Sequence, residues 1–224
     1  MSTQPPELPK PPEPPEPPQL LTFDIFGTVV DWRRGLALSD AQFERVIDRQ
    51  AELEQQRRFR PYAEIVAQSL VDVLRMNAVL AAAAGAQAGR WPLFADSRAA
   101  MERLRLVAPC VAMTNSDRAH GAQVQEQLGP MDGWICAEDL RLYKPDARFW
   151  HETARRRGVV PGPRWWHVSA YADYDHRTAK ALGLTCVLVR RPHSRPRAHD
   201  LEVHDLEVRD LAELAALLES RGRT

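Results

Sequence analysis

The feature that most constrains the fold is an alternation of short apolar runs with helical patterns, which continues from Trp91 to the C-terminus. The apolar runs predict a strand before Lys144 and three others, at 110–113, 165–169 and 185–189. The helical patterns cover residues 96–106, a segment from about 118, and 146–157, 176–182 and 211–221. Strands that alternate with helices form a parallel sheet with helices on both faces. The sequence therefore predicts a doubly wound α/β core.

The first strand of this core is expected near the start of the chain and is separated from the rest by a helical segment. The run L-L-T-F-D-I-F-G-T-V-V at 20–30 predicts a buried strand that ends at Asp24 and a tight turn at Gly27. Residues 36–84 contain one proline, Pro61, and apolar residues at helical spacing, which predicts two or more helices broken near that proline. We therefore expect a core of residues 20–35 and 91–224, with a small helical cap domain of residues 36–90 inserted after the first strand.

Residues 1–19 are rich in proline and predict a disordered tail that favours extended polyproline II. The alternative is that this tail is a ligand for a proline-recognising domain. The sequence by itself leaves both interpretations open.

Charge and apolar content exclude several classes of function. The formal net charge is +0, so no electrostatic argument favours nucleic acid or an anionic membrane. No apolar run approaches the roughly 20 residues of a membrane helix, and no secretory signal begins the sequence, so a cytoplasmic protein is expected. The cysteines Cys110, Cys136 and Cys186 lack paired spacing, which indicates buried core residues and neither a disulfide framework nor a zinc site.

Polar residues follow the predicted strands at the places where ligands bind in an open parallel sheet, outside the carboxyl ends of the strands. These residues are Asp24 with Thr28, Thr114 with Asn115, Lys144, and the stretch from Ser169 to Asp175. A carboxylate near a lysine is kept ionised, as a nucleophile must be. The alternative for Asp24 is an Asx-turn or a helix cap. Convergence of these groups favours a catalytic site.

Four motifs occur in the order known from one enzyme superfamily: F-D-I-F-G-T at 23–28, T-N-S at 114–116, Y-K-P-D-A-R at 143–148 and V-S-A-Y-A-D-Y-D at 168–175. Over residues 20–220 the chain resembles the haloacid dehalogenase superfamily, and within it the L-2-haloacid dehalogenases. Phosphatases of the superfamily usually carry a second Asp two residues after the nucleophile, where this chain has Phe26. Their main acidic magnesium ligand in the fourth motif falls at Tyr171, although Asp173 and Asp175 remain.

The resemblance implies roles for the residues of the strand ends. Asp24 would attack the halogen-bearing carbon to form an ester that water hydrolyses. Lys144 would hold Asp24 ionised and help bind the substrate carboxylate. Asp175 would orient Lys144 or activate water, unless it only caps the helix before His176. Thr28 would bond the nucleophile or anchor its loop. Thr114 would bind the substrate carboxylate, and Asn115 would lie near the halide.

Four further substrate-binding residues follow from the resemblance. D-R-Q-A-E-L-E at 48–54 is similar to the cap segment that supplies a halide-binding arginine, which points to Arg49, although a helix this rich in charge can be a solvated face. Trp150 matches an often aromatic position near the substrate but could be simple helix packing, and Ser169 could replace the serine of the fourth motif. Phe26 would contact the substrate. His167 and His176 flank the loop, and packing is the favoured interpretation for both.

The function that the resemblance implies is hydrolysis of an (S)-2-haloacid, with no metal and no cofactor. The alternatives are a magnesium-dependent phosphatase acting on a small phosphomonoester, and a non-catalytic protein of the same fold that binds partners through its proline tail. The expected partner is a short 2-halo carboxylic acid, with neither nucleic acid nor membrane. The sequence leaves the oligomeric state open; dimers are common among similar enzymes, and an exposed apolar face within 62–80 would be the place of contact.

Overall fold

The structure is a computed structural model that describes residues 15–56, 58–192 and 203–221. Its centre is a sheet of parallel strands in the order β3-β2-β1-β4-β5-β6. The strands are β1 (Leu20–Phe23), β2 (Cys110–Thr114), β3 (Gly133–Cys136), β4 (Trp165–Ser169), β5 (Thr185–Val189) and β6 (Leu206–Val208). The predicted parallel sheet is confirmed. Strand β6 was not predicted, because three residues are too few to show a periodic pattern.

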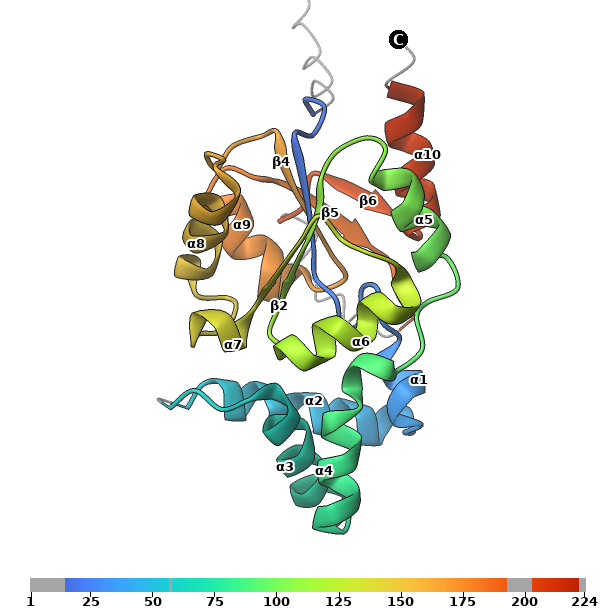
Figure 1. Ribbon diagram of the computed structural model, residues 1–224, viewed down its shortest axis with the longest axis vertical. Helices are drawn as coiled ribbons and strands as arrows, with labels where there is room; N and C mark the ends of the chain where they lie inside the picture. The colour runs from blue at the N-terminus through green and yellow to red at the C-terminus, as the bar shows by residue number, and fades with distance from the viewer. Residues whose placement is uncertain (1–14, 57, 193–202, 222–224) are drawn as a thin grey trace, which may run out of the picture.

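Helices cover both faces of the sheet, as a doubly wound fold requires (Figure 1). Leu21 and Phe23 of β1 belong to the apolar cluster that contains residues of α5 (Ser97–Leu104), α6 (Arg118–Leu128) and α10 (Leu211–Arg221). Leu20 belongs to the cluster of the opposite face, with residues of α8 (Ala147–Arg157) and α9 (Arg177–Ala181). Alternate residues of one strand therefore serve two cores, which explains why the central strands are mostly apolar and lack a regular apolar–polar alternation.

Three helices between β1 and β2 lie together beyond the carboxyl ends of the strands, below the sheet in Figure 1. They are α2 (Asp40–Glu54), α3 (Tyr62–Leu74) and α4 (Ala78–Ala86), and we call them the helical insert. The short helix α1 (Trp32–Leu36) precedes them, and a 3₁₀ turn, η1 (Ala88–Arg90), follows. Helix α3 begins directly after Pro61, where a missing backbone N–H costs nothing. That residues 36–90 form a cap domain stays a prediction.

Contacts between the insert and α6 fix how the insert sits over the sheet. Asp117 precedes α6, and its carboxylate accepts hydrogen bonds from the backbone N–H groups of Tyr62 (2.7 Å) and Ala63 (2.9 Å) at the start of α3. The ring of His120 on α6 lies 2.9 Å from the carbonyl oxygen of Gly85 at the end of α4. Two otherwise unpaired helix ends are thus satisfied by the core.

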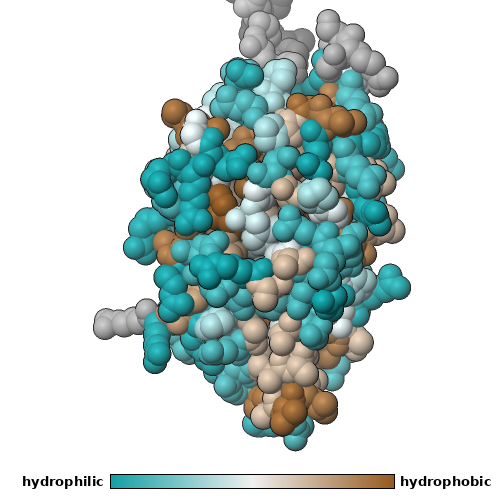
Figure 2. All heavy atoms as spheres, viewed as in Figure 1, coloured by the Kyte–Doolittle hydropathy of each residue, from teal (hydrophilic) through white to brown (hydrophobic). Residues whose placement is uncertain are grey.

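The start of the described chain differs in part from the expectation of a disordered tail. Residues 15–19 lie against the core, where Gln19 donates to the carbonyl of Arg164 and Trp166 donates to that of Glu16. Residues 1–14, most of the predicted disordered tail, lie outside the described residues. Apolar side chains gather at the lower tip of the molecule (Figure 2), and Val79 and Leu80 of α4 are exposed. A homodimer through this tip stays a prediction.

None of the described helices is both long enough and apolar enough to cross a bilayer.

Candidate active site

Asp24 is the first residue after β1, and a tight turn holds it at the edge of the sheet. Its backbone N–H donates to the carbonyl of Val168 on β4 (3.0 Å), so the position is fixed by the sheet itself. Gly27 takes a φ of 92°, and its N–H donates to the carbonyl of Val30 (2.8 Å) to close the turn. This left-handed conformation favours glycine. The Asp24 side chain is 9% exposed and lines a pocket.

We expect Gly27→Ala to destabilise the fold by about 1–3 kcal/mol, because of its backbone conformation and its crowding. A Cβ at this position would overlap the ring of Tyr171. The control is Gly158→Ala, which also has a positive φ but meets no atom within 4 Å. Urea unfolding of both variants measures the crowding as the difference between them. Equal losses would show that Tyr171 does not pack against the turn.

Lys144 reaches Asp24 from a loop and does not follow a strand directly, so the sequence-based placement was wrong in this detail. Strand β3 ends at Cys136, and a short helix, α7 (Ala137–Leu140), lies between it and the loop. The loop is held by Asn115: its Oδ1 accepts from the Lys144 N–H (2.7 Å), and its Nδ2 donates to the Lys144 carbonyl (3.1 Å). A strand end and a loop are thereby joined at the predicted edge of the sheet.

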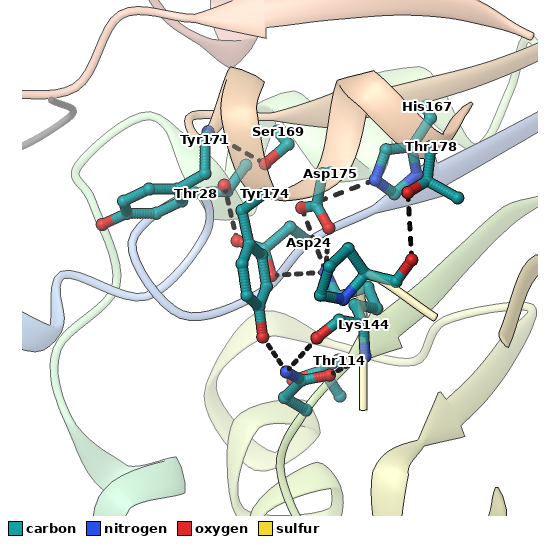
Figure 3. Close-up of polar contacts among 12 residues, drawn as sticks. Asp24, Thr28, Thr114, Lys144, His167, Ser169, Tyr171, Tyr174, Asp175 and Thr178 are labelled. Atoms are coloured by element: carbon teal, nitrogen blue, oxygen red, sulfur yellow. Dashed lines mark hydrogen bonds and ion pairs between the residues drawn. The ribbon is translucent and has the colours of Figure 1, made fainter. Parts of the chain in front are cut away.

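One ammonium group is shared by two buried carboxylates, and we call this arrangement the Asp24–Lys144–Asp175 cluster (Figure 3). Lys144 Nζ donates to Asp24 Oδ1 (2.9 Å) and lies 2.8 Å from Asp175 Oδ1. Asp24 Oδ2 accepts from the Thr28 hydroxyl (2.9 Å), and that hydroxyl accepts from the Ala170 N–H (2.9 Å). Both oxygens of Asp24 therefore have a fixed donor, which orients the carboxylate toward the pocket.

The two carboxyl groups of the cluster differ in acidity. Burial raises the pKa of Asp24 and outweighs the ammonium of Lys144, which lowers it. Burial alone would also raise the pKa of Asp175, but Lys144 and His167 outweigh it and the pKa is lowered. Burial would lower the pKa of Lys144, and the two carboxylates outweigh it, so the pKa is raised. Asp175 is thus the permanent partner of the ammonium, and Asp24 is the more basic carboxyl group.

A buried chain of polar groups supports Asp175 from behind. His167 Nε2 lies 3.5 Å from Asp175 Oδ2, and its Nδ1 lies 2.8 Å from the hydroxyl of Thr22. Trp165 Nε1 donates to the same hydroxyl (2.8 Å). None of these side chains lines the pocket, so their part is to hold Asp175. The neighbouring His176 is buried, and burial lowers its pKa to about 3, which keeps it neutral.

The pocket beside Asp24 has a volume of about 260 Å³ and lies between the core and the insert. Most of its wall is apolar or aromatic, and none of the described residues that line it is Lys or Arg. The core supplies Asp24, Phe26, Trp32, Thr114, Asn115, Ser116, Pro145, Tyr171 and Tyr174, and the insert supplies Ile47, Asp48, Gln50, Ala51, Glu54 and Tyr62. An apolar wall with few polar groups is typical of a small-molecule site.

Glu54, the last residue of α2, brings a second carboxyl group from the insert into this pocket. Its Oε2 accepts hydrogen bonds from the Tyr174 hydroxyl (2.8 Å) and from Asn115 Nδ2 (3.0 Å). Asn115 Nδ2 and the Tyr174 hydroxyl also contact each other. Burial raises the pKa of Glu54 to about 8, so the group is mostly neutral near pH 7.

The structure does not bring Arg49 to the pocket, which corrects the expectation that this arginine receives the halide. Its Nε donates to Asp72 Oδ2 (2.8 Å), and its Nη1 donates to Glu52 Oε2 (2.8 Å). The reason is helical periodicity: the residues of α2 that line the pocket include Ile47, Gln50 and Glu54, and Arg49 lies on another face. The face of α2 that carries Arg49 is a solvent-facing surface, where Arg49 forms ion pairs with Glu52 and Asp72.

Two more predicted contact residues lie behind the pocket. Trp150 is fully buried among apolar residues, and its ring centroid is 5.7 Å from that of His167, so it packs in the core and does not touch the pocket. Ser169 is also buried, and its hydroxyl oxygen accepts from the Tyr171 N–H (3.0 Å), which shapes the turn. Both expectations of substrate contact are therefore wrong for this structure. The Ser169 hydroxyl is used in the turn that follows β4, and the Trp150 ring packs between α8 and the sheet.

The other predicted residues converge. Phe26, Thr114 and Asn115 line the pocket with Asp24, while Thr28, Lys144 and Asp175 lie immediately behind it as partners of Asp24. Phe26 packs against Tyr62 and edge-on against Trp91, with ring centroids 5.4 and 5.8 Å away. Their catalytic and binding roles stay predictions.

Sequence reasoning missed the pocket residues Glu54, Tyr174, Tyr62 and Trp32. A usable signal existed for Glu54, because residues 47, 50, 51 and 54 follow the i, i+3, i+4, i+7 spacing of one helix face. The other three gave no such signal, since an aromatic residue in a helix start or a loop is ordinarily core.

The described residues of the cluster do not fit a divalent cation between its carboxylates. The position between Asp24 and Asp175 is taken by the ammonium of Lys144, and Phe26 stands where a second carboxylate would be required. Across the part of the chain that the structure describes, no three His, Cys, Asp or Glu side chains are grouped to hold a metal ion. The side chain of Asp173, which the sequence left open as a ligand, lies outside the described part.

No protein-family model and no curated protein matches the chain. Solved structures do match. The L-2-haloacid dehalogenase from Xanthobacter autotrophicus is 16% identical, with 91% of this chain and 99% of that chain covered and a TM-score of 0.76. The structure of that enzyme with chloropropionic acid covalently bound is also 16% identical, with 92% of this chain and 100% of that chain covered and a TM-score of 0.76. A defluorinating L-2-haloacid dehalogenase is 24% identical, with 90% and 95% covered and a TM-score of 0.76.

These likenesses confirm the fold that the motifs predicted: the chain has the α/β fold of the L-2-haloacid dehalogenases. Identities below 25% show the fold, and a fold by itself does not establish an activity.

Proposed function

We propose that this chain is a hydrolase that cleaves the carbon–halogen bond of a small 2-halo carboxylic acid through an ester on Asp24, without a metal ion. The observation that carries the proposal is the Asp24–Lys144–Asp175 cluster at the wall of a largely apolar pocket. A carboxylate held by an ammonium and a hydroxyl is a nucleophile in the form that covalent catalysis needs. The fold shared with L-2-haloacid dehalogenases supports the same chemistry.

In the first step a carboxylate oxygen of Asp24 attacks the carbon that bears the halogen. A carbon–oxygen bond forms, the carbon–halogen bond breaks, and the halide leaves with the electron pair. The raised pKa of Asp24 favours this step, because a more basic carboxylate is a better nucleophile. Lys144 and Thr28 keep the carboxylate oriented, and the aromatic wall removes the water that would otherwise shield it.

In the second step water attacks the carbonyl carbon of the ester. The negative charge that develops on the carbonyl oxygen is stabilised by the Lys144 ammonium or the Thr28 hydroxyl, which already donate to the two Asp24 oxygens. Collapse breaks the bond between the carbonyl carbon and the ester oxygen, which Asp24 supplied and which leaves as the hydroxyl oxygen of the product, and the Asp24 carboxylate is restored with an oxygen from water. Overall, one organic halide and one water give one alcohol, one halide and one proton. Asp175 positions Lys144 throughout.

The experiment that tests the proposal is chloride release from L-2-chloropropionate in the presence of EDTA. We expect equal amounts of chloride and lactate, with a rate that EDTA does not change. The D-enantiomer is the control for specific binding. Release that requires added Mg²⁺, or phosphate release from a phosphomonoester panel with no chloride release, would contradict the proposal.

A further inference from the structure

The pocket has an unusual charge for a site that accepts an organic acid. Its described lining contains the carboxyl groups of Asp24, Asp48 and Glu54 and neither Lys nor Arg. Lys144 is already bound to Asp24 and Asp175, so a carboxylate that enters this pocket meets other carboxyl groups and no Lys or Arg side chain of the described lining, which opposes binding. Some group of the wall must therefore offset the repulsion if an acid is the substrate.

Glu54 has the geometry of a hydrogen-bond donor to such an acid. Its Oε2 is used by two donors, the Tyr174 hydroxyl and Asn115 Nδ2. Its Oε1 has no hydrogen-bond partner among the residues that the structure describes. In a neutral carboxyl group the proton would therefore lie on Oε1, and a carboxylic acid can donate that proton to an anion.

No described cation forms an ion pair with Glu54 from the far side of the wall either. Glu54 and Tyr174 also line a neighbouring cavity of about 410 Å³ that contains Arg141 and Arg148. Arg148 is paired with Asp146, and the guanidinium of Arg141 lies over the ring of Phe59, 4.3 Å from its centroid. The nearest cation on the pocket side, Lys144, is bound to Asp24 and Asp175.

We propose that Glu54 selects the substrate by its charge. As a neutral carboxyl group, Glu54 donates a hydrogen bond from Oε1 to the anionic group of the acid. As a carboxylate, it repels that group and excludes the acid. An uncharged analogue is tolerated in both states. This inference rests on the proposed function in one respect: the proposed function identifies the bound acid as a 2-halo carboxylic acid. It assigns a specificity role to a side chain of the insert, so the insert takes part in recognition as well as in closing the pocket.

Several groups face Glu54 and must be separated from it in a pH experiment. The pKa values of Lys144, Tyr62, Tyr174 and Tyr143 are all raised above their usual values, away from neutrality. Burial raises the pKa of Glu54 to about 8, within the range to be tested, and it also raises the pKa of Asp24 in the same pocket, so a variant of Glu54 is needed to separate the two carboxyl groups. The charged and titratable groups around it are Asp24, Asp48, Tyr62, Arg141, Tyr143, Lys144, Asp146, Arg148, Tyr171, Tyr174 and Asp175, with His167 behind Asp175.

The first arm of the test measures binding without chemistry, by calorimetric titration of propionate and propionamide. For the wild type we expect the Kd of propionate to rise about 30-fold between about pH 6.5 and about pH 9.5, because only the neutral fraction of Glu54 accepts the anion. The Kd of propionamide should change less than about threefold over the same range. Circular dichroism at both pH values verifies that the protein stays folded.

The decisive variant is Glu54→Gln, which keeps a donor and an acceptor but cannot ionise. It should bind propionate with a Kd that changes less than about threefold across the same pH range. The matched control is Glu52→Gln on the same helix, whose carboxylate is 65% exposed and pairs with Arg49. This control should keep the pH dependence of the wild type. A dependence that persists in Glu54→Gln, or that is equal for propionate and propionamide, would overturn the proposal.

The second arm repeats the comparison in turnover, with kcat/KM for L-2-chloropropionate and 2-chloropropionamide. The anionic substrate should lose activity above about pH 8 in the wild type and keep it in Glu54→Gln. If neither substrate releases chloride at any pH, the proposed function fails, while the binding arm still decides the role of Glu54. If chloride is released and the binding of propionate does not depend on Glu54, the role of Glu54 fails and the proposed function stands.

Discussion

An Asp24→Asn variant is expected to lose halide release by about 10⁴-fold or more, because an amide oxygen is too weak a nucleophile to displace the halide. The substitution keeps the shape of the side chain, and the amide oxygen can still accept from Thr28 while the bond from Lys144 is lost. The turn after β1 should persist, because backbone hydrogen bonds hold it. Chloride release from L-2-chloropropionate in EDTA measures the loss. With the wild type, one turnover in ¹⁸O-labelled water should also place the label in the Asp24 carboxyl group.

The control for this result is Asp40→Asn, which changes an aspartate whose side chain is 82% exposed. It should release chloride at the rate of the wild type. Unfolding curves of both variants show whether lost activity reflects lost structure. If Asp24→Asn retains halide release, or if the label appears only in lactate and never in Asp24, water attacks the substrate directly and the covalent mechanism is wrong.

Lys144→Met should destabilise the protein by about 3–5 kcal/mol at neutral pH, because it leaves two buried carboxylates without their ammonium. Asp24 and Asp175 both bond Lys144 Nζ, and Asp175 is fully buried. Methionine approximates the shape of the lysine stem, so the loss reports charge and not volume. Urea unfolding measures it as a lower midpoint.

The pH dependence of that loss follows from the same cluster. Without the ammonium, burial and mutual repulsion would raise the pKa of Asp24 and Asp175 in the folded protein above the unfolded values. Groups with a raised folded pKa favour the folded state at low pH and lose that contribution as pH rises. The deficit of Lys144→Met should therefore shrink as pH falls toward about 4. Halide release should be lost as well, since Asp24 would be protonated over a wider range.

Lys180→Met is the matched control, since Lys180 is the other lysine within the described residues. Its side chain is 42% exposed and pairs with Asp205. A surface pair of this kind contributes at most about 1 kcal/mol, so the control should unfold near the wild-type midpoint. Equal unfolding of Lys144→Met and the wild type would show that the cluster is not charged as described.

Most of the helix and strand order of the core, though not β6 or α7, could be predicted from local patterns alone. The apolar runs at β2, β4 and β5 and the proline at position 61 are signals that neighbouring residues carry within a few positions. The convergence of Asp24 and Lys144 was also predictable, because parallel strands place their carboxyl ends at one edge. The helix α7 and the loop after it separate Lys144 from β3, but the Lys144 ammonium still lies beside Asp24, as predicted.

The errors concern the direction in which side chains point from a helix. Arg49 and Gln50 are neighbours in the sequence, but a step of one residue rotates the side chain by roughly 100°. Gln50 therefore lines the pocket while Arg49 pairs with Asp72 on α3. The inward face of α2 is held by contacts with α3, where the Tyr62 hydroxyl donates to Gln50 Oε1 and Gln50 Nε2 donates to the Ser69 hydroxyl.

The sequence by itself determined the α/β core, the nucleophile candidate and its lysine, because strand periodicity and the rule for parallel strand ends act over short stretches of chain. Tertiary structure alone decided the wall of the pocket. It turned Glu54 inward and Arg49 outward, buried Trp150 and Ser169, and made Asp175 the permanent partner of Lys144. The physical reason is that these outcomes depend on burial and on hydrogen bonds between residues far apart in the sequence. Such interactions form only when those elements pack together in the folded chain.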